Sequence, residues 1–273
     1  MIYFPPVKIN LGLQVIRKRT DGFHDIQSVF FPLPIHDILE IIPDPSGKSV
    51  QFSISGIPVP GNLDDNICVK AWQLLKKDFP SLIPVKMHLH KMIPPGAGLG
   101  AGSADGAYAL QMISNLGGLA LNREQLVHYA AMLGSDCPFF IYNTPCLVTG
   151  RGEILEPIAV NLSGKYFMII NPGIHISTRE AFAGIQPSEK EIPLAEIIKA
   201  EPGSWKDKLK NDFEASVFPS HPEIEALRNL LYKNGALYAS MTGSGSTVYG
   251  IYNEAPPLPV FPSSFFTRTI QIP

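Results

Sequence analysis

The sequence contains few of the residues that mark a secreted, metal-binding or nucleic-acid-binding protein. Only three of the 273 residues are cysteines. Cys68, Cys137 and Cys146 are odd in number and scattered, which excludes a disulfide framework and a zinc motif. The formal net charge is −2, whereas general nucleic-acid binders are usually basic. We therefore expect free thiols in a reducing, cytoplasmic setting and no nucleic-acid partner.

Long hydrophobic runs are also missing. No apolar stretch reaches the roughly 20 residues that a membrane-spanning helix needs. Residues 1–6 show no basic start followed by an apolar stretch, so we expect no signal peptide and no membrane partner. Apolar residues nevertheless make up 45 % of the chain. That share is enough for a substantial core in one large or two modest domains.

Helix and strand signals are mixed along the chain without strict alternation. Alternating apolar residues predict a strand over 7–16, with Lys8, Asn10 and Gly12 on its opposite face. The run Asp64-Asp65-Asn66 offers an N-cap for a helix to about residue 79. Asn122, with Gln125 as a capping-box partner, can cap a helix to about residue 134. Further strands are expected over 37–42, 49–55, 85–90, 146–149, 154–158, 165–171, 236–239, 247–252 and 265–272, and further helices over 103–116, 177–184 and 222–234. This order favours an α+β fold over a doubly wound sheet, with a hinge near residues 150–152.

Residues 94–107 form the most distinctive segment, Pro-Pro-Gly-Ala-Gly-Leu-Gly-Ala-Gly-Ser-Ala-Asp-Gly-Ala. Its four alternating glycines lie between a predicted strand and a predicted helix, where free N–H groups and the helix dipole can bind a polyphosphate. No lysine follows Gly102, as a P-loop requires, and the glycine spacing does not match the dinucleotide fingerprint. The alternative interpretation is a tight turn whose glycines only relieve crowding.

Two charged residues lie in apolar surroundings. Asp136 stands in Gly-Ser-Asp-Cys-Pro-Phe-Phe, where it either caps the next turn or accepts and orients a hydroxyl proton. Lys8 lies on the first predicted strand, where it either extends from a sheet edge into water or lies beside a carboxylate or phosphate. The residue types alone leave both choices open.

Three further segments carry weaker signals. Phe23 and His24 end a basic loop and could stack on and hydrogen-bond a base, or form an ordinary turn. The glycine turn over 241–246 is either a tight hairpin or a second wall of a phosphate site. His88 and His90 share a strand face, but no third ligand is evident nearby, so we predict a solvent-facing pair and no side-chain metal site.

Taken in order, residues 6–11, 94–107 and 241–245 resemble the three signatures of the GHMP kinases, which phosphorylate small molecules. Residues 21–24 and 134–140 resemble those members that act on cytidine-diphosphate methylerythritol. The resemblance implies a two-domain α+β fold. Residues 1–152 would be an ATP-binding domain like the second domain of ribosomal protein S5, and residues 153–273 a ferredoxin-like domain, with the active site between them.

The resemblance also implies the reaction and the residues that carry it. ATP, with Mg²⁺, would phosphorylate the 2-hydroxyl of the substrate in the non-mevalonate isoprenoid pathway, with Asp136 as catalytic base and Lys8 as its partner. It assigns nucleotide binding to Asp65, Asn66, Pro94, Pro95, Gly96, Ala97, Gly98, Leu99, Gly100, Ala101, Gly102, Ser103 and Ala104. It assigns substrate binding to Asn10, Phe23, His24, Thr178 and Thr242.

The chain departs from the usual family pattern at four positions. Ala101 replaces a glycine, Ala104-Asp105 replaces Ser-Asn, and Phe23 replaces a frequent tyrosine. Asp105 brings a charge that either suits the helix dipole or faces the phosphate. Whether Arg17, Lys18 and Arg19 touch the diphosphate is open. Alternative functions are phosphorylation of another small alcohol, a non-catalytic nucleotide-binding regulator, and a dinucleotide oxidoreductase, which the glycine spacing disfavours. We expect a monomer or a weak homodimer.

Overall fold

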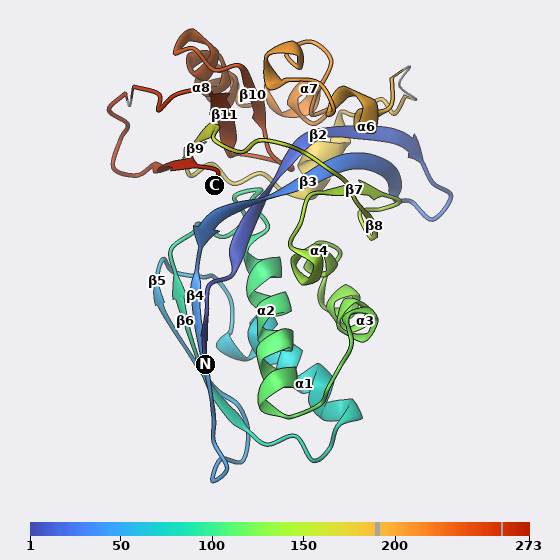
Figure 1. The fold of residues 1–273 in the computed structure, drawn as a ribbon, viewed down its shortest axis with the longest axis vertical. Helices are drawn as coiled ribbons and strands as arrows, with labels where there is room; N and C mark the ends of the chain where they lie inside the picture. The colour runs from blue at the N-terminus through green and yellow to red at the C-terminus, as the bar shows by residue number, and fades with distance from the viewer. Residues whose placement is uncertain (189–191, 258) are drawn as a thin grey trace. The chain divides into compact units, whose positions relative to one another are not determined.

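The computed structural model describes residues 1–188, 192–257 and 259–273, which divide into two compact units (Figure 1). The first unit comprises Met1–Val7, Ile35–Pro95 and Gly100–Asn143, and the second comprises Lys8–Pro34, Gly96–Leu99 and Thr144–Pro273. The units are therefore built from interleaved segments rather than from two successive halves. The family-domain boundary between residues 152 and 153 stays a prediction.

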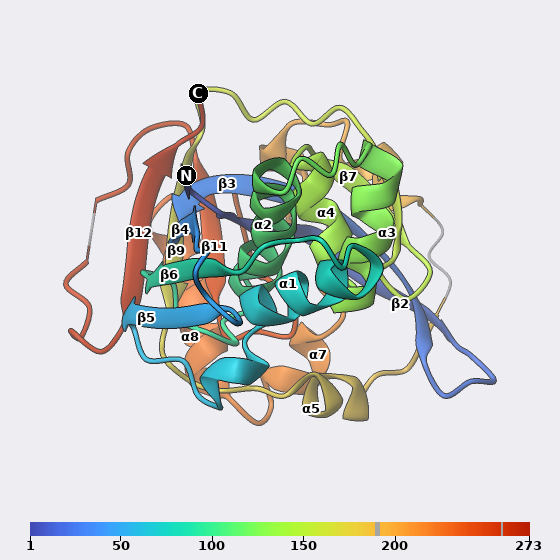
Figure 2. The same cartoon turned by 90° about the horizontal axis from the view of Figure 1, so that it is seen from below.

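The first unit packs helices against one four-stranded sheet. The sheet order is β1 (Ile2–Tyr3), β4 (Ile38–Pro43), β6 (Val85–Lys91) and β5 (Gln51–Gly56), with β5 parallel to β6. Strand β6 buries Val85, Met87 and Leu89, as period-two alternation requires of a half-buried strand. The helices are α1 (Ile67–Asp78), α2 (Ala101–Leu116), α3 (Arg123–Leu133) and α4 (Cys137–Tyr142). Helix α2 packs on β4 and on α1, which lies beside it in Figure 2.

Local capping sets the helix starts in this unit. The Asn66 side chain accepts a hydrogen bond from the Cys68 N–H at the start of α1. At the start of α3, Asn122 and Gln125 form the predicted capping box. Helix α2 begins two residues earlier than expected, and its N-cap is Gly100, with φ at +70°. The glycine loop therefore leads into the helix through a left-handed residue.

The second unit contains two four-stranded antiparallel sheets. One has the order β2 (Pro6–Lys18), β3 (His24–His36), β7 (Cys146–Thr149) and β8 (Ile154–Pro157). The other has the order β10 (Tyr238–Met241), β11 (Val248–Tyr252), β9 (Tyr166–Asn171) and β12 (Phe266–Gln271). By chain order this second sheet reads second, third, first, fourth, as in a ferredoxin-like fold. The helices are α5 (Thr178–Ala183), α6 (Leu194–Ile197), α7 (Glu214–Val217) and α8 (Pro222–Lys233).

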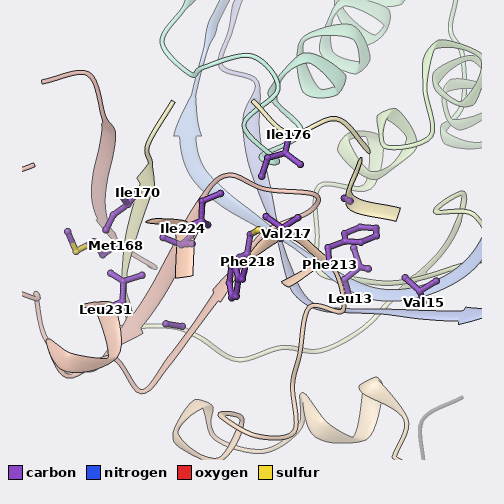
Figure 3. Packing of buried hydrophobic residues seen from close by; sticks show 14 of the residues in the cluster. Leu13, Val15, Met168, Ile170, Ile176, Phe213, Val217, Phe218, Ile224 and Leu231 are labelled. Carbon is purple, nitrogen blue, oxygen red and sulfur yellow. The ribbon is translucent and has the colours of Figure 1, made fainter. Parts of the chain in front are cut away.

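A buried apolar cluster joins β2 to the ferredoxin-like sheet and its helices (Figure 3). Leu13 of β2 contributes to this cluster together with Met168 of β9 and Leu231 of α8. Phe213, just before α7, belongs to the same cluster. Each such side chain contributes about 1.5–3 kcal/mol when it leaves water. The cluster therefore holds β2, which carries Lys8 and Asn10, against the rest of the second unit.

Sequence patterns failed to predict β3, α4 and the turn between β7 and β8. Pro32 and Pro34 argue against a strand, but β3 pairs with β7 only through Ser28–Phe30, so the prolines lie outside that ladder. Residues 150–152, where a hinge is expected, form the tight turn of the β7–β8 hairpin, and their role as a hinge stays a prediction. Gly150 and Gly152 adopt φ values of +68° and +114° there.

Candidate active site

Lys8 is buried rather than extended from a sheet edge. Its side chain is only 4 % exposed, although it carries a charge. The ammonium donates a hydrogen bond to Asn10 Oδ1 at 2.8 Å and lies 4.1 Å from the centroid of the Phe30 ring. The shared strand face predicted for Lys8 and Asn10 is therefore confirmed. An ordered, buried cation of this kind suits an anionic partner or substrate.

Asn10 joins β2 to the third glycine segment, which lies 232 residues away in the chain. Its N–H donates to Thr242 Oγ1 at 3.0 Å, and its side-chain Nδ2 donates to Ser28 Oγ at 2.8 Å. Its carbonyl accepts from the Tyr249 hydroxyl at 2.8 Å. Every polar group of Asn10 is thus used, which fixes its side chain beside Lys8.

The second-unit part of the glycine loop touches the same network. Thr242 Oγ1 lies 3.3 Å from the carbonyl of Gly98, and the Lys8 N–H donates to the Leu99 carbonyl at 2.9 Å. Gly98 has φ at +77°, and a Cβ placed there would lie 2.4 Å from the Thr242 carbonyl oxygen. Only glycine fits this position. The structure therefore brings Lys8, Asn10, Gly98 and Thr242 together.

The glycine loop continues into the first unit as the start of α2. Gly96, Gly98 and Gly100 all have φ between +69° and +77°. A Cβ on Gly102 would meet no described atom within 4 Å, so that side of the helix start is open. Alternating left-handed glycines followed by the positive end of a helix form a cradle for a chain of phosphates. Nucleotide binding by residues 94–104 stays a prediction.

Asp136 follows the turn at the end of α3 and precedes α4. It occupies the N-cap position of α4, as the capping interpretation expects, but within the described residues its side chain makes no capping hydrogen bond there. Burial raises the pKa of the thiol of the next residue, Cys137, to about 12, against a smaller lowering effect of the nearby Ser103 side chain. Since Ser103 lies in the first turn of α2, this proximity places the Asp136 segment near the helix start.

Asp105 faces the protein interior of the first unit. It is 2 % exposed and accepts a hydrogen bond from Lys91 Nζ at 2.9 Å. Lys91 also donates to Asp37, so two carboxyl groups share one ammonium. Burial raises the pKa of Asp105 to about 7 against the attraction of Lys91, and its Oδ1 atom has no hydrogen-bond partner among the described residues. The charge therefore belongs to a core triad.

The hairpin between β2 and β3 presents the predicted base-binding pair. Phe23 is 55 % exposed, with the Arg151 guanidinium 4.9 Å from its ring centroid. The His24 ring stacks on Phe182 with centroids 4.7 Å apart and planes 14° from parallel. Sequence reasoning missed Phe182, because no local pattern links α5 to this hairpin. Arg17 and Arg19 of the same hairpin form ion pairs with Asp25, and Arg19 also pairs with Asp21.

The remaining predicted site residues lie at helix starts. Asp65 ends the short 3₁₀ turn Leu63–Asp65, and Asn66 caps α1, whose Ile67 side chain would lie 2.6 Å from a Cβ on Gly106 of α2. The Asp65–Asn66 pair therefore lies beside the first half of α2. Thr178 begins α5, follows the cap Ser177 and is exposed.

The described residues contain no group of three or more His, Cys, Asp or Glu side chains arranged to hold a metal ion. His88 and His90 instead hydrogen-bond to Ser53 and Ser55 of the neighbouring strand, at 2.8–2.9 Å. In the part of the chain that the structure describes, every helix is too short or too polar to traverse a bilayer.

Comparison with known families identifies the family to which the chain belongs. Residues 66–144 match the family "GHMP kinases N terminal domain", and residues 194–258 match "GHMP kinases C terminal". The chain belongs to the GHMP kinase family. The first matched segment of this GHMP kinase contains the glycine loop and Asp136, and the second contains the Thr242 turn.

Related proteins match this GHMP kinase over nearly its whole length. A protein of Cytophaga hutchinsonii named 4-diphosphocytidyl-2-C-methyl-D-erythritol kinase is 47 % identical over 94 % of each chain. The protein of that name from Bacteroides thetaiotaomicron is 48 % identical, over 95 % of this chain and 94 % of its own. A crystal structure of 4-(cytidine 5'-diphospho)-2C-methyl-D-erythritol kinase covers 92 % of this chain and 90 % of its own, with a TM-score of 0.80 and 29 % identity. Mevalonate kinase of Methanococcus jannaschii, at 12 % identity and a TM-score of 0.68, shares the fold.

Proposed function

We propose that this GHMP kinase transfers the γ-phosphoryl group of ATP to the 2-hydroxyl of 4-diphosphocytidyl-2-C-methyl-D-erythritol, in the non-mevalonate route to isoprenoid precursors. The observation that carries the proposal is the 47–48 % identity, over nearly the whole chain, to kinases named for that substrate. The proposal makes the protein a cytoplasmic enzyme that acts as a monomer or weak homodimer. Residues 1–152 would bind ATP, and residues 153–273 would form the second family domain.

The glycine loop supports ATP as the phosphoryl donor. Backbone N–H groups over 96–104 would hold the phosphates, and the open side at Gly102 leaves room for them. Mg²⁺, when bound with ATP, neutralises charge on the β- and γ-phosphate oxygens. Ser103, at the helix start, would face this end of the nucleotide. Asp65 and Asn66 would lie near the adenine.

The transfer itself needs positioning and charge stabilisation more than covalent chemistry. Asp136 would orient the substrate hydroxyl and take its proton, while that oxygen bonds to the γ-phosphorus and the bond to the β,γ-bridging oxygen breaks. ADP carries away the electron pair of the broken bond. Lys8 would stabilise the negative charge that develops during the transfer. Asn10 and Thr242 would hold Lys8 and the substrate in place.

The hairpin pair supports a cytidine substrate. The exposed ring of Phe23 would stack on the cytosine, and His24 would hydrogen-bond its edge. The stacking of His24 on Phe182 fixes the imidazole plane before substrate arrives. Thr178, at the start of α5, would line the substrate site.

The first test is ATP-dependent phosphorylation of synthetic 4-diphosphocytidyl-2-C-methyl-D-erythritol, with mevalonate and homoserine as control alcohols. We expect product from the cytidyl substrate alone. Turnover of a control alcohol instead would support kinase activity and refute the proposed substrate. ATP binding without turnover of any alcohol would favour a regulatory protein.

The second test replaces the proposed base. Asp136→Asn keeps the size of the side chain and removes its basicity, so we expect turnover to fall by about 10²–10⁴-fold. ATP affinity should stay close to that of the wild type. Glu124→Gln removes an exposed carboxylate in the first turn of α3 and serves as the matched control. Near-normal turnover of Asp136→Asn would eliminate Asp136 as the base.

A further inference from the structure

The segment 211–214, Asn-Asp-Phe-Glu, connects β2 to the Thr242 turn within the second unit. The Leu13 N–H donates to the Lys210 carbonyl at 2.9 Å, and the Asp212 N–H donates to the Leu13 carbonyl at 2.8 Å. The Asp212 carboxylate accepts from the Val15 N–H at 2.9 Å. The segment thus runs as a short parallel extension beside β2, the strand that carries Lys8 and Asn10.

The Asn211 side chain holds the backbone of the turn. It is 2 % exposed, and its Nδ2 donates to the carbonyls of Met241 and Gly243, both at 2.9 Å. Its Oδ1 accepts from the Phe213 N–H at 3.0 Å. Two donors and one acceptor on a planar group are what a carboxamide offers, and a carboxylate cannot supply the donors.

Glu214 binds the same turn at Met241, the residue before Thr242. Its Oε1 accepts from the Met241 N–H at 2.7 Å and from the Ser240 hydroxyl at 2.9 Å. Its Oε2 accepts from Arg228 at 2.7 Å. Asn211 and Glu214 therefore bind the N–H and C=O groups of Met241, before Thr242, and the C=O group of Gly243, after it. We call residues 211–214 the clamp.

The turn packs tightly against the glycine loop. Thr242 Oγ1 accepts from the Asn10 N–H and lies 3.3 Å from the Gly98 carbonyl. A Cβ on Gly243 would lie 3.1 Å from that same carbonyl oxygen. A shift of the turn by a few tenths of an ångström would therefore move Gly98 or break its contact with Thr242.

We propose that Asn211 and Glu214 are positioning residues that set the Gly98 part of the glycine loop through Thr242, and so set the affinity for ATP. The inference rests on the proposed function in one respect, that the glycine loop binds ATP. The clamp residues lie outside the glycine signatures and are not among the candidate catalytic residues.

The test is Asn211→Asp, which keeps the side-chain shape and turns two donors into acceptors facing two carbonyls. We expect the dissociation constant for ATP, measured calorimetrically with Mg²⁺ and no alcohol, to rise at least tenfold. The KM for ATP should rise in parallel, and the KM for the alcohol should change less than threefold. A merely structural role would lower the active fraction and the apparent kcat, and would leave the affinity of the folded protein unchanged.

Two further variants keep the test decisive. Asn211 lines a pocket of about 740 Å³, so water can replace some of the bonds lost in Asn211→Ala, which should fold and bind ATP at least fivefold more weakly. Asn171→Asp is the matched control. Asn171 is 3 % exposed, and its Nδ2 donates to the hydroxyls of Ser246 and Thr247. The Thr247 hydroxyl can turn to donate to the new carboxylate, while the Ser246 hydroxyl keeps its hydrogen bond to the Ile174 carbonyl at 2.6 Å. Its ATP affinity should stay within twofold of the wild type.

The outcomes separate this inference from the proposed function. ATP affinities of both Asn211 variants within twofold of the wild type would overturn the clamp, as would an equal loss in Asn171→Asp. A wild-type protein that binds ATP but does not phosphorylate the cytidyl substrate would refute the proposed reaction and leave the clamp measurement intact.

Discussion

The buried triad of Lys91, Asp37 and Asp105 predicts that the free energy of unfolding depends on pH. Asp37 accepts from Lys91 and from the N–H groups of Met92 and Ile93, so its carboxylate has several donors. Asp105 accepts from Lys91, which it shares with Asp37, and its Oδ1 has no hydrogen-bond partner in the described part of the chain. Burial therefore raises the pKa of Asp105 from 3.8 to about 7. We predict that the free energy of unfolding of the wild type falls as pH rises, and that Asp105→Asn abolishes this fall.

The sign follows from proton linkage. A carboxyl whose pKa is raised by folding binds a proton more tightly in the folded state, so its contribution is fully present below about pH 4 and is lost as pH rises through about 7. At about 1.4 kcal/mol for each tenfold change in proton affinity, the loss between pH 5 and pH 8 is roughly 3 kcal/mol. The carboxamide introduced by Asp105→Asn cannot ionise, and its carbonyl oxygen still accepts from Lys91, which keeps its pairing with Asp37.

The assay is urea denaturation of the wild type and Asp105→Asn at pH 5 and pH 8. The free energy of unfolding of Asp105→Asn, relative to the wild type, should be roughly 3 kcal/mol more favourable at pH 8 than at pH 5. Glu124→Gln controls for the general effect of removing one negative charge. A relative change below about 0.5 kcal/mol, within the scatter of a typical surface substitution, or one of opposite sign, would show that Asp105 is already ionised at pH 5 and refute the reasoning.

Two further predictions concern the glycine loop and the thiols. Gly98→Ala should lower the free energy of unfolding by at least about 2 kcal/mol, because the backbone is left-handed and the new Cβ would clash with the Thr242 carbonyl, and it should weaken ATP binding at least tenfold. Gly61→Ala, at a left-handed residue with no described atom within 4 Å of its Cβ, controls for backbone strain, and equal effects of the two substitutions would contradict the crowding argument. Because burial raises the pKa of all three thiols, that of Cys137 to about 12, iodoacetamide at pH 8 should label none in the native protein and all three in denaturant, and native labelling would show that a thiol is accessible.

Features that depend on a few neighbouring residues could be predicted from the sequence. A cap within Asp64–Asn66 and the Asn122–Gln125 capping box were both predicted, because each depends on side chains two or three residues from their partners. The structure forms the capping box and selects Asn66 as the cap of α1. Strand alternation placed Lys8 and Asn10 on one face, because side-chain direction repeats every two residues. The glycine pattern over 94–107 likewise predicted a left-handed loop before a helix, and its φ values are those of such a loop.

Features that depend on distant segments could not be predicted. No spacing rule relates Asn10 to Thr242, or Asn211 to Met241, because each pair meets only when sheets and connections pack. Strand β3 was missed because its prolines argue against a strand, and in the structure they lie outside the short pairing with β7. Local rules have no information about which ladder a strand joins.

The sequence by itself determined the family signatures, the α+β order of elements and the residue types available for phosphate and hydroxyl chemistry. The tertiary structure alone decided that Lys8 is buried, that Asp105 belongs to a core triad, that His24 stacks on Phe182 and that the clamp holds the Thr242 turn. The physical reason is the range of the interactions. Caps, turns and alternation are set by covalent neighbours, whereas burial, pKa and ring stacking depend on atoms that folding brings in from elsewhere in the chain.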